Sequence, residues 1–178
     1  MALSSSSLVC RVGRQVCALP LTHVREVMRP LPVERLAGVS QAVRGLSVVR
    51  GEPVPVLSLS ALLGGDLPDG ATLPDSVTRF VRLCVDERHL VLAVDAVIDV
   101  HDIDPDSLQG VPALTQADGA GLIARLGTID QSLLVLLSGS HLLSEEDWAR
   151  IRAHAEQVPT DQPPVPDGNA APDAEALS

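Results

Sequence analysis

Two pairs of side chains in the sequence combine a nucleophile with a base: Cys17 with His23, and Ser138 with His141. Nucleophilic catalysis uses such a pair, because the base removes the proton that keeps the sulfur or oxygen weakly reactive. Neither pair lies in a local context, such as a Gly-x-Ser-x-Gly turn, that exposes a nucleophile. We therefore predict that the protein is not an enzyme.

Metal ligation is the second chemistry to consider. The five histidines are scattered, and the sequence has neither an HExxH nor a CxxC motif. The segment 102–106 imitates the start of a calcium loop, but Ser107 stands where that loop needs glycine and Ala113 where it needs a bidentate acid. We expect Asp104 to cap a turn that begins at Pro105 instead. No metal or cofactor is predicted.

The charge distribution bears on the kind of partner. The chain has 178 residues and a net charge of −10. Residues 1–60 carry seven arginines against three acids, whereas residues 61–178 carry six arginines against 20 acids. Most of this surface would repel a polyanion, and Phe80 and Trp148 are the only aromatic residues on which bases could stack. We predict that the protein has no nucleic-acid partner.

The cysteines and the apolar runs bear on localisation. Three cysteines, an odd number, argue against the closed disulfide framework of a secreted domain. The apolar runs are far shorter than the ~20 residues that a membrane span needs. The segment 1–10 lacks the basic start and long apolar centre of an export signal. We expect a cytoplasmic protein without direct membrane insertion.

Short extended runs between glycine and proline turns dominate the sequence. Residues 8–19 predict a hairpin that turns at Gly13 and Arg14, in a register that places Cys10 opposite Cys17. We interpret this cysteine pair as small core residues, with a redox switch as the alternative. Short strands without long helices between them favour antiparallel barrels or sandwiches over a doubly wound parallel sheet. The predicted class is mainly β.

Two further stretches interrupt this β pattern. Pro53 and Pro55 donate no backbone hydrogen bond, which predicts a strand edge or a strand start at that place. Residues 144–158 predict the one long helix, with Ser144 as its N-cap and with apolar residues along one face. Residues 159–178 contain five prolines and four acids, so we predict a disordered, acidic, proline-rich tail.

Over about residues 8–143 the sequence resembles, in order, the CheW-like coupling proteins of bacterial chemosensory arrays. Residues 23–27 resemble the V-x-E-[IV] element of that family, and Gly45-Leu-Ser-Val-Val-Arg-Gly51 resembles its G-[VIL]-x-N-[LW]-R-G signature. Residues 54–59 stand in place of V-P-[VI]-[VI]-D-L, residues 92–100 are similar to the strand pair around V-D-x-V, and residues 121–143 resemble the closing hairpin and short helix.

The resemblance implies a fold and a function. The fold would be two intertwined five-stranded SH3-like barrels with short helices and one C-terminal helix, spanning residues 1–158 with a lobe boundary near 64–76. The function would be that of an adaptor coupling chemoreceptor tips to the regulatory domain of a CheA-type histidine kinase, associated with receptor arrays at the inner face of the membrane. An adaptor of a sister system for pili or another output, and a ligand-binding β-barrel, are the alternatives.

The resemblance also implies a binding site. The family's arginine and glutamate lie near a receptor-facing groove, and the matching residues here are Arg50 and Glu26. We expect the Arg50 stem to lie on apolar surface while its guanidinium reaches Glu26 on a neighbouring strand, with an unpaired, solvated arginine as the alternative. Val24 and Val49 are predicted to line the groove, and burial in the core is an equal alternative for both.

Overall fold

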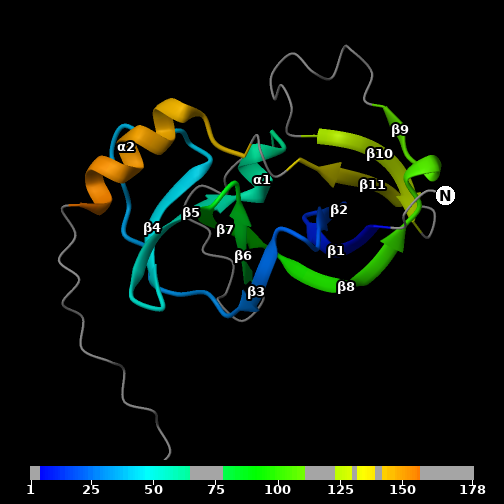
Figure 1. Cartoon of the computed structure of the whole chain (residues 1–178), viewed down its shortest axis with the longest axis horizontal. Helices are drawn as coiled ribbons and strands as arrows, with labels where there is room; N and C mark the ends of the chain where they lie inside the picture. The colour runs from blue at the N-terminus through cyan, green and yellow to red at the C-terminus, as the bar shows by residue number, and fades with distance from the viewer. Residues whose placement is uncertain (1–4, 65–77, 111–122, 130–131, 139–141, 157–178) are drawn as a thin grey trace, which may run out of the picture.

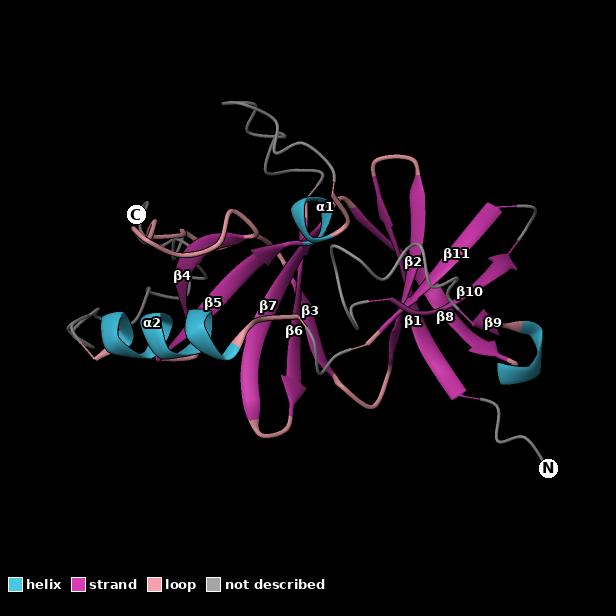
Figure 2. Cartoon of the chain, turned by 90° about the horizontal axis from the view of Figure 1, so that it is seen from above, coloured by secondary structure: helices cyan, strands magenta, loops and turns pink. Residues whose placement is uncertain are grey.

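The computed structural model describes residues 5–64, 78–110, 123–129, 132–138 and 142–156. The strands form two sheets that lie side by side (Figure 2). Five strands from one continuous stretch of chain make the first, which we call the continuous sheet; in sheet order they are β3 (Val24–Met28), β6 (Arg79–Val85), β7 (Arg88–Val94), β5 (Glu52–Ser58) and β4 (Val43–Val49).

The second sheet draws its strands from both ends of the chain, and we call it the split sheet (Figure 1). Its six strands, in sheet order, are β8 (Ala96–Ile103), β1 (Ser5–Val12), β2 (Gln15–Pro20), β11 (Ser132–Leu137), β10 (Ile123–Ile129) and β9 (Gln109–Gly110). The helical elements are α1 (Leu59–Leu62), the 3-10 turn η1 (Pro105–Ser107) and α2 (Glu145–Ala155).

Three buried clusters hold these sheets together. A shared core between the two sheets contains Leu8 and Leu19 of the split sheet and Leu83 and Leu92 of the continuous sheet, among other residues. Alternate residues of a strand point to opposite faces, so Val91 enters a separate continuous-sheet core on the far side of β7. A smaller split-sheet core is built from three buried residues: Ala18, Ile103 and Leu134.

The predicted fold class is confirmed, because the chain is mainly β with two sheets, short helices and one C-terminal helix. One sheet has six strands instead of five, since the two-residue β9 adds to its edge. The predicted lobe boundary near 64–76 stays a prediction. Residues 65–77 lie outside the described residues, but β5 before them and β6 after them belong to the same sheet. The chain crosses between sheets after β2 and again after β7, at Asp95.

The predicted N-terminal hairpin is also confirmed. β1 and β2 pair with Val12 opposite Gln15 and Cys10 opposite Cys17. Gly13 in the turn has φ 57°, a left-handed conformation that glycine adopts without a Cβ penalty. Both cysteines are fully buried and unbridged, and burial raises their pKa values to about 12 for Cys10 and about 11 for Cys17. Such thiols stay protonated and weakly nucleophilic at neutral pH.

Pro53 and Pro55 occupy the part of β5 that has a partner strand on one side only. Both pair with β4, opposite Val48 and Leu46. The parallel pairing of β5 with β7 begins one residue later, at Val56. A proline lacks the N–H that a second partner strand would need, so this arrangement agrees with the predicted strand edge.

Helix α2 closes one end of the continuous sheet (Figure 1). Ser144 caps its N-terminus, where the hydroxyl oxygen accepts a hydrogen bond from the Asp147 N–H at 3.1 Å, as predicted. Ile151 is 3% exposed and packs with Val43 and Leu46 of β4. The end of the predicted helix near residue 158 and the predicted tail, 159–178, lie outside the described residues.

Candidate functional site

Glu26 lies on β3, at the edge of the continuous sheet. Its Cα is paired with that of Arg82 on β6, and a β-bulge between Val24 and Glu26 shifts the register there. On β6, Arg82 lies between Val81 and Leu83, which enter the shared core. Alternation therefore directs the Arg82 side chain to the opposite face, on the side of Phe80 and the continuous-sheet core.

Arg50 occupies the turn between β4 and β5. Its φ is 52° and that of Gly51 is 85°, which matches the two positive φ values of a type I′ hairpin turn. A non-glycine residue pays about 1–2 kcal/mol for this left-handed conformation. The turn fixes where the Arg50 stem leaves the hairpin.

The predicted pair between Arg50 and Glu26 is present and bidentate. Arg50 Nε donates to Glu26 Oε1 at 3.0 Å, and Arg50 Nη2 donates to Glu26 Oε2 at 2.6 Å. The Arg50 side chain is 72% exposed, whereas that of Glu26 is 24% exposed. A planar guanidinium matches a carboxylate in this two-bond geometry, which holds both groups in one orientation.

Two further residues extend the pair. Arg82 Nη1 donates to Glu26 Oε1 at 3.2 Å, and Arg82 Nη2 donates to Glu52 Oε2 at 3.1 Å. We call this series, Arg50, Glu26, Arg82 and Glu52, the charge ladder. Acids and arginines alternate along it, so each acid that it contains has a positive neighbour.

The charge ladder changes the acidity of Glu26. Hydrogen bonding from Arg50 is the main cause that lowers the pKa of the Glu26 carboxyl to about 2, and Arg82 acts in the same direction against the effect of partial burial. The Arg50 pKa is raised by the same hydrogen bond. The ion pair is therefore fully charged at neutral pH.

The other two predicted site residues are placed differently. Val49 is 2% exposed and belongs to the continuous-sheet core, so the structure favours the core alternative over the groove for this residue. Val24 is half-buried, and it packs against the shared core on the face opposite Glu26. Val27 on β3 is an apolar residue with 43% exposure, and the sequence analysis did not single it out as a surface residue.

Of the two nucleophile–base pairs considered for catalysis, the structure describes both members only of Cys17 and His23. Cys17 is buried in β2 with its pKa raised, and it faces Cys10. His23 directly precedes β3 of the continuous sheet, and its carbonyl accepts a hydrogen bond from the Cys84 N–H of β6. His141, the base of the second pair, lies outside the described residues. Asp104 Oδ1 accepts a hydrogen bond from the Asp106 N–H at 2.9 Å, which is the predicted turn cap.

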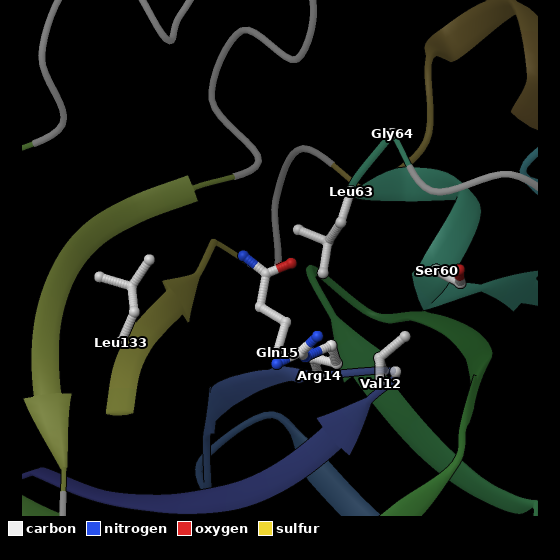
Figure 3. Close-up of a pocket in the computed structure, with 8 residues that line it drawn as sticks. Val12, Arg14, Gln15, Ser60, Leu63, Gly64 and Leu133 are labelled. Atoms are coloured by element: carbon white, nitrogen blue, oxygen red, sulfur yellow. The ribbon is translucent and has the colours of Figure 1, made fainter. Parts of the chain in front are cut away.

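A pocket of about 540 Å³ lies between the β1–β2 hairpin, α1 and the start of β11 (Figure 3). Val12, Leu63 and Leu133 supply apolar walls. Gln15 extends across the space and Ser60 of α1 lies on the far side, so these two polar groups do not converge. A small-ligand site usually presents a few convergent polar groups. Gln15 and Ser60, in the described lining of this pocket, do not show that arrangement.

The chain is thus a two-sheet β protein, and its candidate site is the charge ladder on the continuous sheet. The family model of the CheW-like domain matches residues 6–147. The sequence is 23% identical to the chemotaxis protein CheW of Klebsiella aerogenes over 144 residues, which cover 81% of this chain and 84% of that protein.

A crystal structure of the scaffolding protein TtCheW from Thermoanaerobacter tengcongensis has the same fold, with a TM-score of 0.70 and 19% identity. The match covers 82% of this chain and 96% of that one. This chain belongs to the CheW-like domain family. The predicted family and its function class, a coupling protein of chemotaxis signalling, are thereby confirmed. None of the helices in the described part of the chain has the length and apolar character that a membrane crossing requires.

Proposed function

We propose that this chain is a non-catalytic adaptor that docks on chemoreceptor tips and on the regulatory domain of a CheA-type histidine kinase. It would work in the cytoplasm, at receptor arrays on the inner face of the membrane. Membership of the CheW-like family supports this role. We further propose that the face of the continuous sheet carrying Glu26 and Arg50 is turned toward the receptor.

The observation that carries this second step is the geometry of Arg50. Its Nε and Nη2 atoms are held by Glu26, yet its side chain is 72% exposed. Within the described residues, Nη1 has no acceptor, so the outer edge of the guanidinium faces solvent in a fixed orientation. An immobilised cation loses less side-chain entropy when a partner binds than a freely rotating arginine does. Charges of this kind contribute register and specificity more than bulk affinity.

The first test is co-sedimentation with receptor fragments, with and without the kinase regulatory domain. We expect the chain to bind each partner alone and to join them in one complex. Binding to neither partner would remove the adaptor function. Binding to the kinase domain alone would rule out both docking on the receptor and the receptor-facing assignment, and would leave only the kinase contact.

The second test is a double-mutant cycle on Arg50→Ala and Glu26→Ala, read out by affinity for the receptor fragment. We expect the double variant to lose less than the sum of the two single losses, because each residue acts through the other. Additive losses would show that the pair does not act as a unit. Arg14→Ala is the matched control, since Arg14 is also exposed in a two-residue hairpin turn but lies on the split sheet.

A further inference from the structure

Arg82 is an arginine inside a sheet. Its strand, β6, lies between β3 and β7, and its side chain is only 11% exposed. Its Nε is buried and, in the described part of the chain, has no hydrogen-bond partner. Charged side chains are seldom buried unless they are paired, because removal from water is costly. The position of Arg82 therefore calls for an explanation beyond strand formation.

Its two partners lie on strands that do not pair with each other. Glu26 is on β3 and Glu52 is on β5, and both β6 and β7 separate these strands in the sheet order. One guanidinium contacts both carboxylates, at 3.2 Å and 3.1 Å. Arg82 thus links the strand that carries Glu26 to the start of the strand that follows the Arg50 turn.

The bond to Glu26 falls on a shared atom. Glu26 Oε1 accepts from Arg50 Nε and from Arg82 Nη1, while Oε2 accepts from Arg50 Nη2. Arg50 alone is mostly exposed and could carry the carboxylate with it through several rotamers. A third donor from a mostly buried side chain removes that freedom, because a carboxylate with three fixed donors has one orientation.

We propose that Arg82 is the positioning residue of the charge ladder: it fixes the Glu26 carboxylate from beneath, and Glu26 in turn fixes the exposed guanidinium of Arg50. Glu52 holds the other side of Arg82. The consequence for receptor binding rests on the proposed function, whereas the positioning itself does not. Arg82 acts through Glu26 and needs no contact with a partner.

The test compares Arg82→Met with wild type by following the Glu26 carboxyl carbon in an NMR pH titration. We expect the pKa of Glu26 to move from about 2 toward its ordinary range, and the Arg50 Nε–H to exchange faster with solvent, because one of three donors is gone. Arg82→Lys keeps the charge but not the fork, so we expect an intermediate result. If Arg82→Met fails to fold, Arg82→Lys alone provides the test.

Arg88→Met is the matched control. Arg88 lies on the neighbouring strand and also forms an ion pair, with Glu145 of α2, but it has no bond to the ladder. A change in the Glu26 pKa that arose from a general loss of stability would appear in both Arg82→Met and Arg88→Met. An unchanged Glu26 pKa in Arg82→Met and Arg82→Lys, or an equal change in Arg88→Met, would overturn the positioning role.

Receptor affinity separates this proposal from the proposed function. We expect Arg82→Met to bind the receptor fragment about threefold to tenfold more weakly, a smaller loss than that of Arg50→Ala. If the Glu26 pKa rises while Arg50→Ala binds as well as wild type, positioning holds and the receptor-facing assignment fails. If Arg50→Ala weakens binding and Arg82→Met changes neither the Glu26 pKa nor the receptor affinity, the receptor-facing assignment holds and the positioning role of Arg82 fails.

Discussion

The two sheets are built from similar strands, but they fill their separate cores differently. The continuous-sheet core has six buried members, including Phe80 at 1% exposed, and half-buried Met28, Leu31 and Val33 pack around it. Among the described residues, the split-sheet core has three buried members, one of them the small Ala18, and half-buried Val16, Leu108, Ile129 and Leu136 pack around it. The ladder lies on the face with the larger core. Fixed surface charges need a rigid support, and dense packing beneath β6 provides it.

The sharpest way to test this difference is to empty each core. We expect Phe80→Ala to lower the free energy of unfolding by about 3–5 kcal/mol, because a large fully buried side chain leaves a cavity. Leu134→Ala, in the split-sheet core, should fall nearer the low end of about 2–5 kcal/mol, since fewer buried neighbours surround it and the site can collapse. Chemical denaturation measures both. Equal losses would remove the contrast between the two cores.

A second contrast comes from two glycines with positive φ. A Cβ on Gly45 of β4 would lie 1.9 Å from the Glu34 carbonyl oxygen, and the φ of Gly45 is 145°. We expect Gly45→Ala to cost about 2–4 kcal/mol through backbone strain and overpacking together. Gly13→Ala in the split-sheet turn should cost about 1–2 kcal/mol, because nothing lies within 4 Å and only the φ of 57° opposes it. Thermal unfolding of both variants checks this order.

Acid should affect the continuous sheet through Glu26. Its pKa is lowered from 4.5 to about 2 in the folded protein, so the unfolded chain binds more protons between these values. Stability from this group is therefore complete above about pH 4.5 and is lost as the pH falls toward 2. We expect Glu26→Gln to flatten the fall in unfolding free energy across that window. An unaltered slope would show that Glu26 titrates normally.

The smallest effect is expected at the cysteine pair of the split sheet. With pKa values of about 12 and about 11, Cys10 and Cys17 should not react with an alkylating reagent while the protein is folded. Cys84 on β6 is half-buried and should react first. Mass spectrometry after timed labelling distinguishes the three sites. Labelling of Cys10 at the rate of Cys84 would show that the split sheet opens readily.

Local patterns carried most of the fold prediction. The hairpin turn at Gly13 and the N-cap at Ser144 were predicted because each depends on a few neighbouring residues. The sheet that each strand joins depends on distant residues instead. The parallel pairing of β2 with β11, in which Val16 lies opposite Leu134, has no local signal in the sequence.

The site was predicted in part. The family resemblance pointed to Arg50 and Glu26, and their pairing is present. Arg82 and Glu52 were missed, although an arginine amid the apolar run of β6 was a visible signal. For Val49 the sequence left groove and core as equal alternatives, and the structure places this side chain in the continuous-sheet core.

The order of the split sheet also bears on synthesis of the chain. The hairpin of β1 and β2 leaves the ribosome before the other described strands, yet β2 pairs with β11, whose first residue follows roughly 110 residues later. At about 5–20 residues per second, that interval is about 6–22 s. The continuous sheet has all its strands within residues 24–94, so we expect it to form on the nascent chain. At that stage the edge of β2 that later pairs with β11 would still be unpaired. Nascent chains arrested before β11 would then present that edge to chaperones, and protease protection confined to residues 24–94 would reveal it.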